Sequence, residues 1–523
     1  MIDLDVVTLS RLQFALTAMF HFIFVPLTLG LAFMLAIMES VYVMTGKDIW
    51  RRMTMFWGKL FGINFAVGVA TGVVMEFQFG MNWSYYSHYV GDIFGAPLAI
   101  EGLMAFFMEA TFIGMFFFGW NRLSKIGHLI VTWLVAIGAN FSALWILIAN
   151  GWMQNPQGAY FNPHTMRMEL QNFAEVIFNP VAQAKFVHTV SAGYTLGAVF
   201  VLGISAWYVM RGRHLEIARR SMVVAASFGL AGSLSVAVLG DESGYLTTEH
   251  QKMKIAAMES MWNTEPAPAN FNVIAIPNQE ERRNDFAIEI PWVMGLIGTR
   301  SVTEPMEGIN DLVALAETQV RSGLIAYDAM QTLRQDKENA EAQAVFDEHW
   351  KDLGYALLLK KYTQDIRNAT PEQIAQAAWD TVPQVAPLFW TFRIMVAIGF
   401  YLIAFFIVAF YLASKDRLTQ SPRFLKLALF TIPLPWIAIE CGWFVAEFGR
   451  QPWIIEGVLP TYYAVSGLSV ADLLISLSIF FVLYSILAIV GVKVMLHAVR
   501  QGPDDEPKPA STTDLAADAA LAK

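Results

Sequence analysis

The feature that most constrains the fold of this chain is a series of nine stretches of about 20 or more largely apolar residues. A helix of that length crosses a bilayer, and helices satisfy their own backbone hydrogen bonds in hydrocarbon. The expected spans are 12–43, 54–80, 94–120, 128–151, 184–210, 220–240, 388–414, 425–447 and 469–497. With 56% hydrophobic and 15% charged residues, the sequence predicts an all-α, polytopic membrane protein of about nine transmembrane helices.

Basic residues in the short loops predict the orientation, because cytoplasmic loops collect Lys and Arg. The loops at one end of the expected bundle carry thirteen of these residues and the loops at the other end carry three. The thirteen are Lys47, Arg51, Arg52, Arg122, Lys125, Arg211, Arg213, Arg219, Arg220, Lys415, Arg417, Arg423 and Lys426, and the three are Arg167, Lys185 and Arg450. We therefore expect an outer N-terminus and a cytoplasmic C-terminus.

A long polar segment between spans six and seven divides the chain. The expected parts are 1–240 with spans one to six, 241–387 as an extracytoplasmic subdomain, 388–500 with spans seven to nine, and 501–523 as a disordered cytoplasmic tail. Within the subdomain, 304–336 and 338–361 have the pattern of amphipathic helices, and Glu265–Pro268 that of an extended loop. The sequence Thr370-Pro371-Glu372-Gln373 predicts a helix start.

Charge and cysteine content exclude several classes of function. The formal net charge is −9, and no run of basic residues suggests a nucleic-acid partner. The one cysteine, Cys441, lies within span eight, so an intrachain disulfide or a thiolate cluster for zinc or iron–sulfur cannot form. Any redox cofactor must therefore use other ligands.

Side chains able to bind heme iron occur near the outer ends of three spans. His21 and His188 lie in spans one and five, and Met395 lies at similar depth in span seven. A thioether opposite an imidazole is a known axial pair of low-spin heme, and Arg393, two residues before Met395, requires an anion such as a carboxylate or a heme propionate. Hydrogen-bonded packing of the histidines and core filling by the methionine remain the alternatives. Together these residues favour several hemes near the outer face.

Carboxylates inside the spans form a second set of candidates. Glu440 and Glu447 are seven residues apart and share one face of span eight. A buried pair between Glu447 and Arg450 is the alternative to a ligand role. Glu101 and Glu109 lie in the apolar and aromatic span three, where unpaired carboxylates are expected to hold or relay protons.

Other redox membrane proteins fit less well. No span contains two histidines about thirteen residues apart, as a b-type cytochrome built on histidine pairs would need. A heme–copper oxidase needs a cluster of intramembrane histidines, and only His21 and His188 lie well inside spans. A transporter with intramembrane carboxylates and a structural anchor for a partner enzyme remain open.

Four motifs give the chain a specific resemblance to the main subunit of the cytochrome bd quinol oxidases. The resemblance runs from the first span through the ninth and leaves out only the C-terminal tail. The motifs are Ser10-Arg11-Leu12-Gln13-Phe14-Ala15, Trp57-Gly58-Lys59-Leu60-Phe61-Gly62-Ile63-Asn64-Phe65, Gly91-Asp92-Ile93-Phe94-Gly95-Ala96-Pro97-Leu98, and Gly442-Trp443 with Gly449-Arg450-Gln451-Pro452-Trp453.

The resemblance implies roles for the candidate heme ligands. His188 and Met395 match the axial ligands of the low-spin heme b558. His21 and Glu447 match ligands of the high-spin hemes, and we assign His21 to heme b595 and Glu447 to heme d, although the two could be exchanged.

The remaining candidates also match positions of the family. Glu101 and Glu109 match acids linked to heme d and to proton delivery, and Arg393 and Arg450 match positions that hold propionates or tune the heme potential.

The outer subdomain resembles the family's quinol-binding loop in its long form. Lys254 and Glu259, in the sequence Lys252–Glu259, match quinol-site positions, although the sequence alone would place both on a solvated helix face. Asp241, directly after span six, is a third candidate near the membrane surface.

By resemblance, the chain is the heme-bearing subunit of a terminal oxidase in a bacterial cytoplasmic (inner) membrane. It would oxidise quinol at the outer face and reduce O2 to water with cytoplasmic protons, so that a proton gradient forms without pumping. Its expected partners are a second large membrane subunit, one or more small single-span subunits, and membrane lipid.

Overall fold

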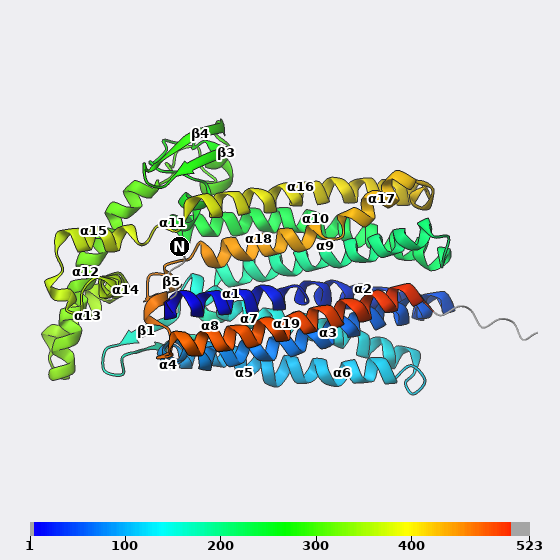
Figure 1. Ribbon diagram of the computed structural model, residues 1–523, viewed down its shortest axis with the longest axis horizontal. Coiled ribbons are helices and arrows are strands. Elements are labelled where there is room, and N and C mark those ends of the chain that lie inside the picture. The colour runs from blue at the N-terminus through cyan, green and yellow to red at the C-terminus, as the bar shows by residue number, and fades with distance from the viewer. Residues whose placement is uncertain (1–4, 504–523) are drawn as a thin grey trace, which may run out of the picture.

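A computed structural model describes residues 5–503 and shows a long helical bundle with a smaller subdomain at one end (Figure 1). Nine segments of these residues are long and apolar enough to cross a membrane, which confirms the predicted number. They are Val6–Thr45, Asp48–Met81, Gly91–Phe118, Lys125–Gln154, Phe173–Met210, Leu215–His250, Val385–Ser414, Pro422–Phe448 and Val470–Gln501. The prediction for the tail falls largely on residues 504–523, which lie outside the described residues.

Several of the nine segments consist of more than one helix. The elements of the bundle are α1 (Val6–Phe22), α2 (Val25–Thr45), α3 (Asp48–Met81), α4 (Ser84–Tyr89), α5 (Gly91–Ile100), the π-helix η1 (Glu101–Phe106), α6 (Phe107–Phe118), α7 (Lys125–Gln154), α8 (Phe173–Ile177), α9 (Pro180–Met210), α10 (Leu215–His250), α16 (Val385–Ser414), α17 (Pro422–Thr431), α18 (Leu434–Phe448) and α19 (Val470–Gln501). The hairpin strands β1 (Ala159–Asn162), β2 (Arg167–Leu170), β5 (Trp453–Ile455) and β6 (Leu459–Pro460) connect bundle helices.

The first span is broken between α1 and α2. Pro26 lies in the first turn of α2 and has no N–H to donate to a backbone carbonyl of the preceding turn. Side chains from neighbouring helices satisfy carbonyls at the break: Trp436 Nε1 donates to Ile23 O at 2.8 Å, and Asn64 Nδ2 donates to Phe24 O at 2.8 Å. A broken helix inside a membrane needs such partners. The break therefore ties α1 to α18 and α3 at the level of His21.

Small residues bring α2 and α9 into close contact at the centre of the bundle. Gly193 and Gly197 are four residues apart, and a Cβ built on Gly30 would lie 2.4 Å from Gly193 O and 2.9 Å from Gly197 Cα. Such spacing of small residues lets two helix backbones approach each other in a membrane.

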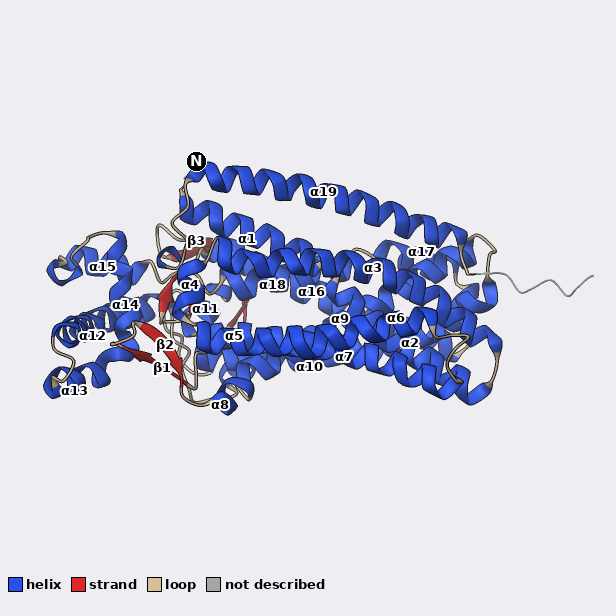
Figure 2. Cartoon of the chain, turned by 90° about the horizontal axis from the view of Figure 1, so that it is seen from below, coloured by secondary structure: helices blue, strands red, loops and turns tan. Residues whose placement is uncertain are grey.

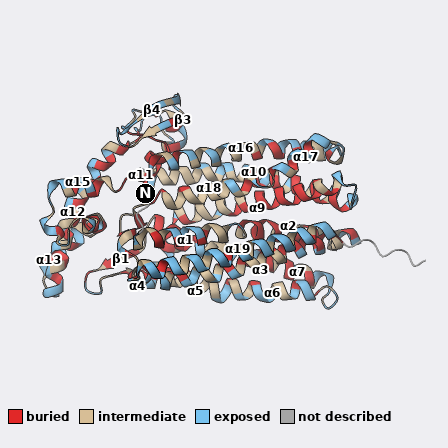
Figure 3. Cartoon of the chain, viewed as in Figure 1, coloured by how far each residue is buried: buried red, intermediate tan, exposed pale blue. Residues whose placement is uncertain are grey.

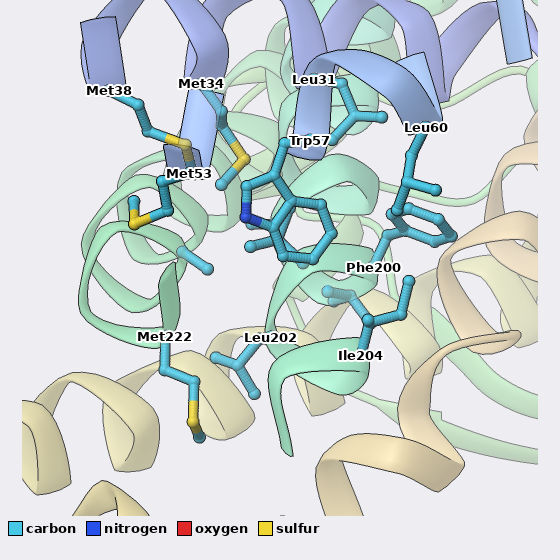
Figure 4. Packing of buried hydrophobic residues seen from close by; sticks show 14 of the residues in the cluster. Leu31, Met34, Met38, Met53, Trp57, Leu60, Phe200, Leu202, Ile204 and Met222 are labelled. Carbon is cyan, nitrogen blue, oxygen red and sulfur yellow. The ribbon is translucent and has the colours of Figure 1, made fainter. Parts of the chain in front are cut away.

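The largest buried cluster surrounds Trp57, toward the end of the bundle that lies away from the subdomain. Figure 4 shows its indole ring among Met34, Met53, Leu60 and Phe200 from three helices, and its Nε1 donates to Ser221 Oγ at 2.9 Å. Burial is greatest along α2 and α9, whereas α19 is exposed along most of its length (Figure 3). The exposed apolar faces are those expected to contact lipid.

The subdomain between spans six and seven lies at the end of the bundle where α1 begins (Figure 1), and Figure 2 shows the strands gathered at that same end. Its elements are α11 (Lys252–Met258), β3 (Phe271–Asn278), β4 (Arg283–Ile290), α12 (Ile309–Gln335), α13 (Ala340–His349), α14 (Leu353–Leu357) and α15 (Pro371–Trp379). The capping box predicted at Thr370 is present, with hydrogen bonds in both directions to Gln373.

Two predicted features of the subdomain differ from the structure. The expected helix at 338–361 is divided into α13, α14 and 3₁₀ turns. Gly354, within α14, packs so closely on Gly457 that a Cβ would lie 2.2 Å from the Gly457 carbonyl oxygen. The antiparallel pair β3–β4 was not predicted, although Ile274 and Ile276 alternate with less apolar residues as a strand would. Helix α10 also continues ten residues past the expected end of span six, so Asp241 is helical.

A buried polar cluster lies at the bundle end away from the subdomain. Nδ1 of His128, on α7, is 2.6 Å from Glu39 Oε1 of α2, and its Nε2 is 2.9 Å from Phe116 O in the last turn of α6. Thr132 Oγ1 donates to Glu39 Oε2 at 2.5 Å. Glu39 and His128 are both at most 2% exposed, so one imidazole joins three helices.

We expect Glu39→Leu to lower the free energy of unfolding by about 3–5 kcal/mol, because it leaves the buried imidazole without its carboxylate. Thermal unfolding of the detergent-solubilised protein measures this change. Glu216→Gln, in a largely exposed pair with Arg220, is the control and should have an effect of less than about 0.5 kcal/mol. Equal stability of the two variants would contradict the prediction.

Candidate functional site

The two candidate ligands of the low-spin heme lie in a group of four helices. Helix α10 packs against α9 and α16, and α16 packs against α18. His188, on α9, and Met395, on α16, lie roughly 12 and 15 Å from the starts of their helices at 1.5 Å per residue. Both starts are at the subdomain end (Figure 1), so the two side chains share a similar depth.

Glycines make room for both side chains. A Cβ built on Gly240 of α10 would lie 3.0 Å from the ring of His188, and one built on Gly442 of α18 would lie 2.9 Å from Sδ of Met395. The Nδ1 atom of His188 is buried against α10, close to Gly240 and to the backbone of Val236. Because Nδ1 faces α10, Nε2 on the other side of the ring is the nitrogen left to bind an iron. The donors present fit a His–Met heme.

His21 has a tautomer that suits metal binding. Its Nδ1 is 2.8 Å from Thr71 Oγ1, whose hydroxyl is directed at the backbone carbonyls of Val67 and Gly68. The hydroxyl therefore accepts from Nδ1–H, which leaves a lone pair on Nε2. A Cβ built on Gly72 would lie 3.1 Å from the ring. Because α1 begins at Val6 rather than at residue 12, His21 lies roughly 22 Å from the start of its helix.

Glu447, in the last turn of α18, is held by several donors. Its Oε1 accepts from Asn150 Nδ2 at 3.0 Å, Gln154 Nε2 at 3.1 Å and Lys185 Nζ at 3.3 Å. Its Oε2 accepts from Arg450 Nη2 at 2.6 Å. The ion pair left open as an alternative in the sequence is therefore present.

Both candidate propionate-binding arginines keep unpartnered N–H groups. Arg450 is 4% exposed, and its Nε and Nη1 are buried without partners among the described residues. The same holds for Nη1 of Arg393. Buried guanidinium groups normally pair with acceptors, so these atoms fit the carboxylate groups of a heme.

Arg393 also joins the bundle to the subdomain. Its Nη2 donates to Glu259 Oε2 at 2.6 Å, its Nε donates to the main-chain oxygen of Asn272 on β3 at 3.1 Å, and its guanidinium lies 4.3 Å from the ring centroid of Phe389. Burial raises the pKa of the Glu259 carboxyl, and Arg393 acts in the opposite direction. The anion expected near Arg393 is thus the carboxylate of Glu259, a candidate residue of the quinol site.

Lys254 is buried at the other side of the short helix α11. Its Nζ donates to Gln154 Oε1 at 2.5 Å and to Gln251 Oε1 at 2.8 Å. Since Gln154 also donates to Glu447, one amide links the two predicted site residues. Burial lowers the pKa of the Lys254 ammonium. Lys254 and Glu259 are 6% and 2% exposed, so they do not lie on the solvated helix face that the sequence without the family resemblance would favour.

The carboxylates of the third span lie against α7. Ser142 Oγ donates to Glu101 Oε1 at 2.6 Å. Glu109 is buried against Gly138 of α7, and a Cβ built on Gly138 would lie 3.6 Å from the Cβ of Glu109. Glu101 begins the π-helix η1, and such distortions often occur at functional sites.

Asp241 lies apart from these residues. Its carboxylate and that of Glu242 pair with Arg300 at 3.0 and 2.7 Å, and all three side chains are 40–45% exposed. The structure therefore places Asp241 on the surface rather than in the network around Lys254.

Sequence reasoning assigned no role to five residues of this network: Asn150, Gln154, Lys185, Gln251 and Glu456. Gln154 and Asn150 are polar residues at the end of an apolar span, and Lys185 precedes His188 by three residues, so their positions gave a usable signal. Glu456 follows span eight in a short hairpin, and nothing in the sequence marks it as part of this network.

The fold and site define a multi-pass helical membrane protein whose His, Met and Glu side chains offer heme ligands near one end. Residues 9–503 match the family described as Cytochrome bd terminal oxidase subunit I. The chain is 53% identical to Cytochrome bd-II ubiquinol oxidase subunit 1 of Escherichia coli over 95% of its length and 97% of that protein. It is 34% identical to Cytochrome bd ubiquinol oxidase subunit 1 of Bacillus subtilis over 95% and 94%.

A solved structure shows the same fold. The bd oxidase from Geobacillus thermodenitrificans matches with a TM-score of 0.77 and 25% identity, covering 96% of this chain and all of the matched one. The chain belongs to the cytochrome bd terminal oxidase subunit I family, whose members are subunits of respiratory quinol oxidases. This membership confirms the predicted activity, implies hemes and further subunits, and sets aside the transporter and anchor alternatives.

Proposed function

We propose that this chain oxidises ubiquinol at the end of the bundle where the subdomain lies, and that this end faces the outside of the cytoplasmic membrane. The observation that carries the proposal is the position of α11. Lys254, on this helix, and Glu259, which directly follows it, are both buried at the bundle end. Lys254 is linked to Glu447 through Gln154, and Glu259 accepts a hydrogen bond from Arg393.

These two side chains have the chemistry that quinol oxidation requires. The Lys254 ammonium has three N–H groups and donates two of them to glutamine oxygens, so the third can bind a quinol oxygen. The Glu259 carboxylate can accept the proton of a quinol hydroxyl, and its raised pKa makes it a better base.

The hemes, when bound, would supply electron transfer and the reduction of O2 to water. We assign His188 and Met395 to heme b558, His21 to heme b595 and Glu447 to heme d, with the last two open to exchange. Their support is the position of His188, whose Nδ1 faces α10 so that Nε2 is left for iron, the lone pair on Nε2 of His21, and the glycines that leave room for the rings.

The chain also offers sites for the protons that water formation consumes. Glu109 of α6 and Glu101 of η1 pack against α7, and Ser142 of α7 donates a hydrogen bond to the Glu101 carboxylate. We propose that they hold protons drawn from the cytoplasmic side, which would generate a potential without pumping. The exposed apolar faces of α19 and its neighbours would contact lipid, the second large subunit and small single-span subunits.

Lys254→Met tests the quinol site. In the purified complex, it should raise the KM for a short-chain ubiquinol about 30-fold, because a buried charged hydrogen-bond donor is lost. Lys252→Met is the matched control on the same helix: Lys252 is half exposed and pairs with Glu307 at 2.6 Å, so its KM should not change. Oxygen consumption as a function of quinol concentration measures both. Equal KM values would contradict the assignment of Lys254.

A further inference from the structure

The Lys254 ammonium lies in the protein interior with neutral oxygens as its direct partners. Gln154 and Gln251 supply these oxygens, and the lysine is 6% exposed. A Cβ built on Gly449 would lie 3.0 Å from Cγ of Lys254, so the lysine stem is also enclosed. A buried ammonium without a nearby anion is strongly unfavourable, so its counter-charge must come from beyond these two amides.

Gln251 leads to a partly buried carboxylate that the site described above does not use. Its Nε2 donates to Glu456 Oε2 at 2.9 Å, while its Oε1 accepts from Lys254. Glu456 follows β5 in the hairpin, and its backbone N–H donates to Met153 O at 2.9 Å. One amide group therefore lies between the ammonium and the carboxylate, and the backbone of α7 fixes the carboxylate's position.

The charges of the cluster point to Glu456 as the partner of Lys254. Three cations, Lys185, Lys254 and Arg450, lie near two carboxylates, Glu447 and Glu456. Glu447 already bonds directly to Lys185 and Arg450. Glu456 is thus the carboxylate that remains to balance Lys254.

We propose that Glu456 is a positioning residue of the quinol site, whose carboxylate, joined to Lys254 through Gln251, balances the buried ammonium and directs it toward a quinol oxygen. This inference rests on the proposed function and deepens it. Glu456 does not touch the quinol. It acts through Lys254, so its loss should weaken quinol binding more than it slows turnover.

The same arrangement fixes the direction of a pH effect. Lys254 faces negative charge from Glu456 and Glu447 and positive charge from Lys185 and Arg450. Glu456 faces Lys254 and Arg450, and it also lies near Tyr355. Burial lowers the pKa of Lys254 and Glu456 opposes this effect, so removal of the carboxylate lowers that pKa further. As the pH rises, Lys254 would therefore lose its proton at a lower pH in a variant without this carboxylate than in the wild type.

The test is Glu456→Gln in the purified complex with its hemes and partner subunit. Glutamine keeps an oxygen that can accept from Gln251 and removes only the charge. We expect the KM for a short-chain ubiquinol to rise about tenfold, kcat to stay within about twofold, and the rise of KM with pH to begin at a lower pH. The heme spectrum should be unchanged.

Glu307→Gln is the matched control, since it removes a carboxylate that pairs with Lys252 at the surface of the same helix. It should leave both KM and its pH dependence as in the wild type. If Glu456→Gln does not assemble, the double variant Gln251→Glu with Glu456→Gln, which returns a carboxylate beside Lys254, should show a nearly wild-type KM.

Three results would overturn the inference: wild-type KM and pH dependence in Glu456→Gln, an equal change in Glu307→Gln, or a tenfold defect in the double variant. A wild-type complex that oxidises no quinol would instead contradict the proposed function itself.

Discussion

Replacement of Met395 by leucine is expected to abolish the low-spin heme signal and nearly all quinol oxidation. Leucine has a similar volume and fits beside Gly442, but it has no sulfur to bind iron. A dithionite-reduced minus air-oxidised spectrum of membranes that contain the variant with its partner subunit measures the signal. Oxygen consumption with quinol measures the activity, for which we expect a loss of at least about 100-fold.

A methionine of the packed core provides the control for this substitution. Met222, on α10, is completely buried beside Leu202 and Ile204 in the cluster of Figure 4. Met222→Leu should cost less than about 1.5 kcal/mol of stability and leave the spectrum unchanged. A low-spin band of normal height in Met395→Leu would show that another side chain ligates this heme.

The nine spans could be predicted because each is long, apolar and nearly free of charge. These properties can be read from residues that are adjacent in the sequence. The depths of His188 and Met395 followed from their distances to the span ends. The start of the first helix was predicted too late, because α1 extends to Val6, beyond the apolar stretch, where Asp5 caps it.

The contacts of the site could not be predicted in the same way, because they join distant parts of the chain. Lys254 and Glu259 belong to a short polar segment that looks solvated until the ends of α7, α16 and α18 enclose it. The pairing of Arg393 with Glu259 spans 134 residues, and that of Gln251 with Glu456 spans 205. Sequence periodicity holds no information on such pairs, so Glu456 was missed and Arg393 was given an anion of unknown source.

Glu447→Gln is expected to have two effects, because the carboxylate is placed both to balance charge and to bind iron. It removes the anion that contacts Lys185 and Arg450, and losing these charged hydrogen bonds of a partly buried carboxylate costs about 1.5–3 kcal/mol of stability. It also removes a proposed ligand of a high-spin heme. Thermal unfolding of the solubilised complex measures the first effect, and the heme content of each complex measures the second.

Glu440→Gln separates these two roles. Glu440 lies seven residues earlier on the same face of α18, and both of its carboxylate oxygens lack hydrogen-bond partners among the described residues. The substitution therefore breaks no ion pair, and we expect both stability and heme content to be retained. A loss of stability in Glu447→Gln with every heme retained would leave Glu447 as the counter-charge of Lys185 and Arg450 alone. The second high-spin heme would then require a ligand other than Glu447.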